Sequence, residues 1–186
     1  MTPILASLLL AAALGASAAP SAGGKKVERQ EKPAVVDASY EVFMPSEWTI
    51  ERRAGGAVFT GPAADGVAAL ISVRFVRPDH PQYGSPEEYM KRLTRPSSIP
   101  VKGWKDGPVE KAAVAGRKAL RLERDTTEFS SPRTMSPKEV PMREEHVAVS
   151  AAKGFYLLIY TAPASIDKAQ RPVFRGLVEK GFKPKL

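Results

Sequence analysis

Short segments of alternating apolar and polar residues follow one another closely between residues 38 and 77. We expect strands over 38–44, 48–52, 57–60 and 67–77, because their apolar residues recur at every second position. Only short turns rich in Pro, Gly, Ser and Asp separate them. Parallel neighbours need a crossover of a dozen or more residues, so these strands must pair antiparallel. The first part of the domain is therefore predicted to be an antiparallel meander.

The middle of the chain predicts one helix followed by more strands. Ser85 is a good N-cap, Pro86 suits the first helical position and Glu88 completes a capping box, which together favour a helix over 85–93. Residues 96–108 are expected to be loop and 126–141 a mobile excursion. Strands are expected over 109–114, 117–124, 142–150 and 155–160. The last of these is apolar on both faces, which is typical of a central strand covered on both sides.

The C-terminal part predicts a short turn near 165–170 and a helix that starts at Pro172. A proline inside a helix costs about 3 kcal/mol, so the helix is not expected to run through it. Gly181 is expected as the residue that ends this helix, with Phe182 packing back on its last turn. The sum is an α+β domain, an antiparallel sheet of seven or eight strands with at least two helices packed on it.

The N-terminus predicts export. Residues 4–14 form an uncharged apolar run that is too short for a membrane span, and Gly15 and the small residues Ala16-Ser17-Ala18 follow it. We therefore expect a signal peptide over 1–19, a flexible linker over 20–37 and a single domain over 38–186. The alternative is a retained membrane anchor. The chain has no Cys, which excludes disulfides, thiolate zinc sites and a lipid-anchored cysteine.

The charge balance is basic, with 28 Lys and Arg against 20 Asp and Glu and a formal net charge of +8. In an exported protein this charge suits anionic lipid headgroups, cell-wall polymers or acidic partners better than nucleic acid. The alternative is that the charge serves solubility alone, because the basic residues are spread along the chain. After cleavage no transmembrane span is expected, and the product is predicted to be soluble in the periplasm or outside the cell.

Several segments resemble PsbP-like domains in their order and spacing. They are the opening 40–48, which ends in Pro45-Ser46-Glu47-Trp48, the strand entry 116–119, the strand pair 145–149 and 155–160, and the ending 166–182. Position 47 is Glu, where the family pattern has Gly. The resemblance implies an α/β/α sandwich around an antiparallel sheet. It also implies partner binding without a shared catalytic site, as in an extrinsic photosystem II subunit, a Ran-binding import factor and bacterial exported proteins.

Two histidines are the candidates for chemistry. Asp79 and His80 lie in a Pro-rich loop and could supply two metal ligands, although a solvated loop explains them as well. Glu144 and His146 lie two apart on an expected strand, on the face opposite Val147 and Val149. Neither histidine is accompanied by a nucleophile elbow, and the sequence has no phosphate-binding glycine loop. A metal-dependent or hydrolytic enzyme using His146 or His80 is thus the alternative function, and no cofactor is predicted.

The two tryptophans are expected to differ. Trp48 fits the core by its periodicity. Trp104 lies in an expected loop with Lys102, Lys105 and Arg95 near it in sequence, which would suit an anionic or carbohydrate surface. The sequence therefore favours an exported, non-enzymatic binding or accessory protein of the bacterial cell envelope, with a protein or anionic partner. A third hypothesis is a basic protein that binds the envelope surface by charge.

Overall fold

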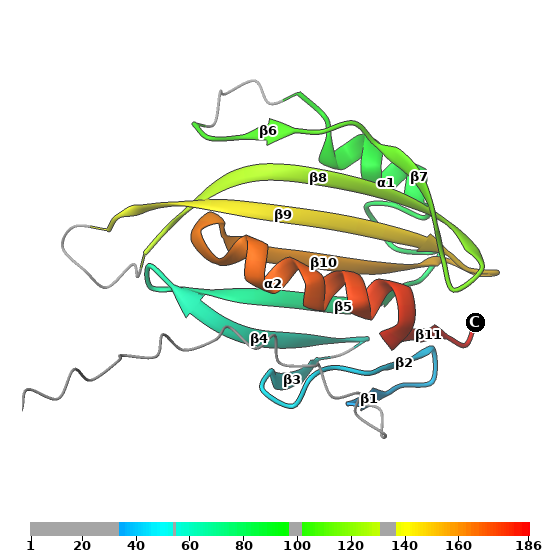
Figure 1. Cartoon of the computed structure of the whole chain (residues 1–186). Coiled ribbons are helices and arrows are strands. Elements are labelled where there is room, and N and C mark those ends of the chain that lie inside the picture. The colour runs from blue at the N-terminus through cyan, green and yellow to red at the C-terminus, as the bar shows by residue number, and fades with distance from the viewer. Residues whose placement is uncertain (1–33, 54, 97–101, 131–136) are drawn as a thin grey trace, which may run out of the picture.

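A computed structural model describes residues 34–53, 55–96, 102–130 and 137–186, and shows one large antiparallel sheet (Figure 1). The sheet has eight strands in the order β3-β4-β5-β10-β9-β8-β6, and β7 also pairs with β8. This confirms the predicted α+β class. The strands are β3 (Thr49–Arg53), β4 (Gly56–Ala64), β5 (Val67–Val76), β6 (Lys105–Asp106), β7 (Glu110–Val114), β8 (Arg117–Phe129), β9 (Glu139–Ser150) and β10 (Phe155–Pro163).

A small second sheet brings the two ends of the described domain together. It consists of β1 (Val35–Val36), β2 (Tyr40–Val42) and β11 (Phe182–Pro184), in the order β1-β2-β11. The expected linker boundary at residue 37 is too late, because Val35 is only 4% exposed and packs in the core. A two-residue strand is too short to show a period, so the sequence could not predict it. The expected signal peptide lies outside the described residues.

The first helix, α1 (Pro86–Leu93), begins where its capping residues predict. The Glu88 backbone N–H donates to the Ser85 side chain at 3.2 Å. The Glu88 carboxylate reaches one residue further back than expected and accepts from the Gly84 N–H at 2.7 Å. The helix start is therefore stabilised by two side chains of its own first turn.

The second helix, α2 (Ala164–Gly176), contradicts the prediction of a turn followed by a helix from Pro172. Pro172 lies inside α2, and its side chain is exposed. The carbonyl of Lys168, which loses its helical partner, therefore lies on the solvent side, where water can bind it. The expected apolar stripe is confirmed, since Phe174 and Leu177 are buried.

Gly181 ends the helical segment, as expected, but without a positive φ. A π-helical turn, η1 (Leu177–Gly181), follows α2 directly and leads into β11. The Gly181 carbonyl accepts from the Phe43 N–H at 2.8 Å, and a Cβ at this glycine would lie 2.7 Å from the Phe43 carbonyl oxygen. Close backbone approach is therefore the reason for glycine here.

Three loop predictions are wrong because strands extend further than their apolar alternation. β4 continues to Ala64 through an irregularity in register between Thr60 and Ala63. β8 and β9 form a long hairpin that includes residues 126–129 and 139–141, the two ends of the expected excursion 126–141, of which 131–136 lies outside the described residues. The expected loop 96–108 contains β6. Hydrogen bonds to a neighbouring strand support these stretches, and a periodicity argument does not detect such bonds.

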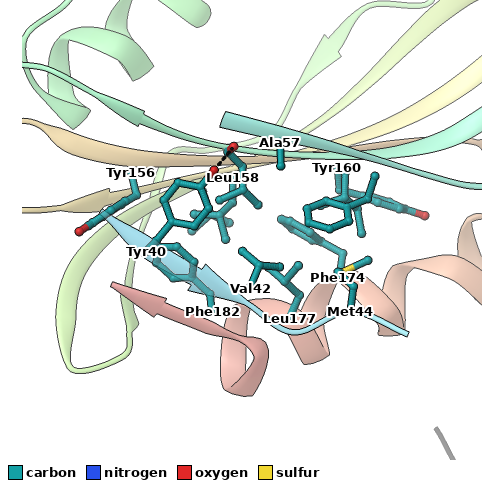
Figure 2. Close-up of a cluster of buried hydrophobic side chains, with 14 of the residues drawn as sticks. Tyr40, Val42, Met44, Ala57, Tyr156, Leu158, Tyr160, Phe174, Leu177 and Phe182 are labelled. Carbon is teal, nitrogen blue, oxygen red and sulfur yellow. Dashed lines mark hydrogen bonds between the residues drawn. The ribbon is translucent and has the colours of Figure 1, made fainter. Parts of the chain in front are cut away.

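The sheet has a core on each face, and β10 contributes to both. On one face α2 and the small sheet cover a cluster that includes Tyr40, Phe174 and Leu177 (Figure 2). Tyr156 and Leu158 of β10 point into this cluster. On the other face α1 covers a second cluster. Its members include Tyr83, Met90, Leu122, Phe155 and Leu157. The central position predicted for residues 155–160 is confirmed.

Charged residues connect α2 to the sheet beside the apolar cluster. Glu145 of β9 is 3% exposed, and Arg121 Nε donates to one of its oxygens at 2.7 Å. Arg171 of α2 reaches the other oxygen at 3.3 Å and also donates to Asp167 at 3.0 Å. Because Glu145 contacts cations from both β8 and α2, its carboxylate holds the helix against the sheet.

We expect Glu145→Ala to lower the free energy of unfolding by about 3 kcal/mol. This is the lower end of the range for breaking a buried ion pair, because Arg121 and Arg171 are partly exposed and can be rehydrated. Urea denaturation monitored by circular dichroism measures the change. Glu51→Ala, which removes a fully exposed pair with Arg53, should leave the urea midpoint unchanged. Equal midpoints for both variants would contradict the role of Glu145.

Two glycines near the C-terminus form a matched pair. Gly181→Ala should destabilise the domain by about 1–3 kcal/mol, because the new methyl group overlaps the Phe43 carbonyl. Gly176 lies in α2 with open space around its missing Cβ, so Gly176→Ala should be neutral or stabilising by up to about 1 kcal/mol. Thermal denaturation of the two variants distinguishes close approach from helix propensity. A stabilised Gly181→Ala would disprove the steric argument.

Candidate functional site

Glu144 and His146 lie on the face of β9 opposite Val147 and Val149, as predicted. α1 covers this face and adds a third group, because the Tyr89 hydroxyl lies 2.7 Å from His146 Nδ1. His146 Nε2 lies 3.1 Å from one Glu144 oxygen, and Thr126 of β8 donates to the other at 3.0 Å. The four side chains form one hydrogen-bonded chain between α1 and the sheet.

The direction of each hydrogen bond follows from Tyr89. Burial raises the pKa of the Tyr89 hydroxyl, so this group keeps its proton and donates it to His146 Nδ1. The His146 proton is then on Nε2, where it is donated to the Glu144 carboxylate. Both ring nitrogens are therefore engaged, one as acceptor and one as donor.

Glu144 is held in its ionised form. Burial alone would raise its pKa, but the hydrogen bonds that it accepts from His146 and Thr126, together with the positive charge of Arg124, bring that pKa below its usual value. An ionised Glu144 is the acceptor that fixes the His146 tautomer. This arrangement orients the imidazole and couples α1 to β9, but it leaves no nitrogen lone pair for a metal or a substrate proton.

The other enzymatic candidates are not brought together in the described part of the chain. His80 stacks on Tyr83, with the ring centroids 4.4 Å apart, and its Nδ1 accepts from the Gln82 N–H at 3.3 Å. The Ser165 hydroxyl, a conceivable nucleophile, donates a hydrogen bond to the Asp65 carboxylate at 2.9 Å. The described residues contain no group of three or more His, Asp or Glu that could hold a metal ion.

The two tryptophans behave as predicted. Trp48 is buried, and its ring lies against Gly61, where a Cβ would come within 2.6 Å of the ring. Trp104 is 48% exposed. The Arg124 guanidinium lies over the Trp104 ring, 4.7 Å from its centroid. The sequence did not predict this contact, because Arg124 comes from the opposite strand.

Arg124 is itself buried and fixed. Its Nε donates to Asp106 at 2.5 Å, and its terminal nitrogen donates to the Leu93 carbonyl at the end of α1 at 2.6 Å. The cation that supports Trp104 is therefore held by both β6 and α1. A partner that contacts Trp104 would meet an aromatic ring on a rigid base.

The predicted basic neighbours of Trp104 are exposed, but acidic groups lie among them. Lys102 pairs with Glu139 of β9 at 2.8 Å, and Lys105 lies opposite Asp125 in the strand register. Arg95 follows the end of α1 and is exposed. We call Trp104, Arg124, Lys102, Lys105 and Arg95 the Trp104 corner. This surface carries both signs of charge and is not a uniformly basic patch.

None of the helices in the described ranges is long and apolar enough to cross a membrane.

Glu144→Gln should remove a pH-dependent part of the stability. Since folding lowers the pKa of Glu144 below its ordinary value of 4.5, the stability from its ionised form is complete above that value and is lost as the pH falls through the folded pKa. The wild type should therefore exceed Glu144→Gln by about 1–2 kcal/mol at pH 7, and the gap should shrink below pH 4.5. Urea midpoints between pH 3 and 7 measure this, with Glu128→Gln as the exposed control. A constant gap would contradict the prediction.

Comparison with known proteins gives structural similarity only. No family model matches the chain, and no curated protein matches it in sequence. The structure of CyanoP, the cyanobacterial PsbP of Synechocystis sp. PCC 6803, is similar to this one with a TM-score of 0.51. The two sequences are 13% identical, and the alignment covers 89% of this chain and 98% of CyanoP. LpqN of Mycobacterium tuberculosis, described as involved in cell envelope biogenesis, is 14% identical with a TM-score of 0.49, covering 85% of this chain and 92% of LpqN. A protein of Bacteroides thetaiotaomicron is 9% identical with a TM-score of 0.45, covering 79% of this chain and 45% of that one. The similarity to CyanoP and the sheet topology establish that this chain has the PsbP-like fold.

Proposed function

We propose that this chain is an exported, non-enzymatic binding or accessory protein of the bacterial cell envelope, and that it contacts its partner through the Trp104 corner. Export rests on the signal-peptide pattern in residues 1–19. A role in binding agrees with a PsbP-like fold, but a fold alone does not determine a function, so the argument depends on the site.

The observation that carries the proposal is the way in which Trp104 is exposed. A tryptophan loses favourable burial when it faces water, and interface residues that contribute most to binding are often Trp and Arg. Here Trp104 is 48% exposed, yet Arg124 supports its ring and is itself fixed by Asp106 and Leu93. A side chain that is both exposed and rigid loses little conformational entropy when a partner covers it.

The geometry of the histidines supports the same choice. His146 has both nitrogens in hydrogen bonds, and His80 stacks on Tyr83 in a partly exposed loop. A general base needs a free lone pair near a substrate. The proposed binding role needs no such group.

Trp104→Ala should weaken partner binding by at least tenfold, because the truncated side chain leaves a gap at the centre of the contact. The measurement is a pull-down from envelope extracts with the mature protein as bait, quantified by mass spectrometry and followed by affinity measurement on the recovered partner. Ile50→Ala is the matched control, since Ile50 is 42% exposed on β3 at the opposite edge of the sheet. Equal recovery of every partner by wild type and Trp104→Ala would refute the proposed contact.

Salt dependence separates this proposal from a purely electrostatic envelope protein. Because the Trp104 corner carries paired charges, its binding should fall only a few-fold between 50 mM and 500 mM salt. A basic protein held at an anionic surface by net charge would lose binding steeply over this range. Steep loss in wild type that Trp104→Ala does not alter would favour the electrostatic hypothesis.

A further inference from the structure

Arg74 lies on β5 on the same sheet face as α1 and has no counter-ion among the described residues. Its terminal nitrogen donates to the Tyr83 hydroxyl at 2.8 Å. Its Nε is fully buried and is the one such side-chain atom without a hydrogen-bond partner in the described part of the chain. A partly buried cation normally has a carboxylate or another acceptor beside it, because desolvation is costly.

Tyr83 adds a second donor at the same place. Its oxygen accepts from Arg74, so its own proton points to a different acceptor, and the described residues supply none. Tyr83 is held from both sides, by the stacked His80 ring and by an edge contact with Tyr89 at 5.1 Å. An Arg N–H and a Tyr O–H therefore converge next to β5, and both are of the type that binds an anionic oxygen.

The sheet face beside Arg74 is only partly covered, and it carries Ser72 and two threonines, Thr60 and Thr161, among apolar side chains. α1 packs on β8 and β9, and the described helices leave this face of β4 and β5 without a helix. Val58 lies opposite Ser72 in the register of β4 and β5, and Ser72 lies opposite Ile159 of β10. Leu70, further along β5, is 37% exposed. The strip from Arg74 to Leu70 runs about 14 Å along β5, with Ser72 at its middle and the apolar side chains of Val58 and Ile159 on either side of it.

We propose that Arg74 and Tyr83 bind the carboxylate of a single-chain amphiphile, such as a fatty acid, whose apolar chain lies along Val58, Ile159 and Leu70. The anionic head supplies a counter-charge for Arg74, and the two terminal guanidinium nitrogens can bind a carboxylate through parallel N–H donors while Nε stays buried. The alkyl chain of the ligand covers apolar side chains that the helices leave accessible to water. Charge complementarity identifies the head, and the apolar strip identifies the body.

This site is separate from the Trp104 corner, so the two proposals can fail independently. Trp104→Ala should leave amphiphile binding unchanged, and Arg74→Gln should leave recovery of the envelope partner unchanged.

Isothermal titration calorimetry with dodecanoate, below its micelle concentration, tests the site. Arg74→Gln should weaken binding about tenfold to a hundredfold, because it removes the charge of a hydrogen-bonded ion pair. Arg53→Gln is the control. Arg53 of β3 and Arg74 of β5 both lie opposite Gly56 of β4, one on each side, but Arg53 is exposed and paired with Glu51. Equal affinity of wild type and Arg74→Gln for dodecanoate would overturn the proposal.

Two further measurements keep the test decisive if Arg74→Gln does not fold. Tyr83→Phe keeps the cation and should weaken dodecanoate binding several-fold by removing one donor. In the wild type, dodecanol has the same chain without the charge and should bind at least tenfold more weakly than dodecanoate. Dodecanol binding as tight as dodecanoate would overturn the proposal. Arg74-dependent binding to anionic phospholipid vesicles, with no binding of monomeric dodecanoate, would also overturn it in favour of a membrane surface.

Discussion

The rest of the structure depends on the burial of β10 on both of its faces. This strand pairs with β5 along one side and with β9 along the other, and Tyr156 and Leu158 face one core while Phe155 and Leu157 face the other. An antiparallel sheet can leave one face to water, but a strand that is apolar on both faces cannot. The two helices are therefore required to cover opposite faces, which produces the layered α+β fold.

The two covering helices are held in different ways. α2 combines a wide apolar stripe with the ion pairs of Glu145, and the small sheet at the chain ends adds Tyr40 and Phe182 to the same core (Figure 2). α1 is only eight residues long and buries few side chains, so a large share of its attachment is polar. Its connections run from Tyr89 to His146 and from the Leu93 carbonyl to Arg124. The candidate functional groups lie on this more polar face.

The sequence predicted those parts of the fold that depend on residues close together along the chain. The cap at Ser85, the two-sided strand 155–160 and the apolar stripe at Phe174 and Leu177 all follow from spacing along the chain, and the structure confirms them. Pro172 shows the limit of such rules, because its cost depends on which side of α2 faces water.

The long β8–β9 hairpin shows a second limit. Its outer part includes Thr126, Thr127 and Glu128 of β8 and Pro141 of β9, and these residues lie in strands because each strand supplies the other's backbone hydrogen bonds. The candidate site needed the same long-range information. Alternation placed Glu144 and His146 on one face, but only the packing of α1 brings Tyr89 to the imidazole, and only strand pairing places Arg124 under Trp104.

The buried polar groups of the α1 face can be separated by whether their hydrogen bonds are satisfied. His146, Glu144 and Arg124 each have partners on at least two sides, as a buried polar group requires when its role is to hold elements together. Arg74 on the same face has a buried donor without an acceptor. A folded domain gains no stability from such a group, since its desolvation is only partly compensated. The satisfied network therefore explains how α1 stays on the sheet, and the unsatisfied cation marks the place where this face is complementary to a ligand.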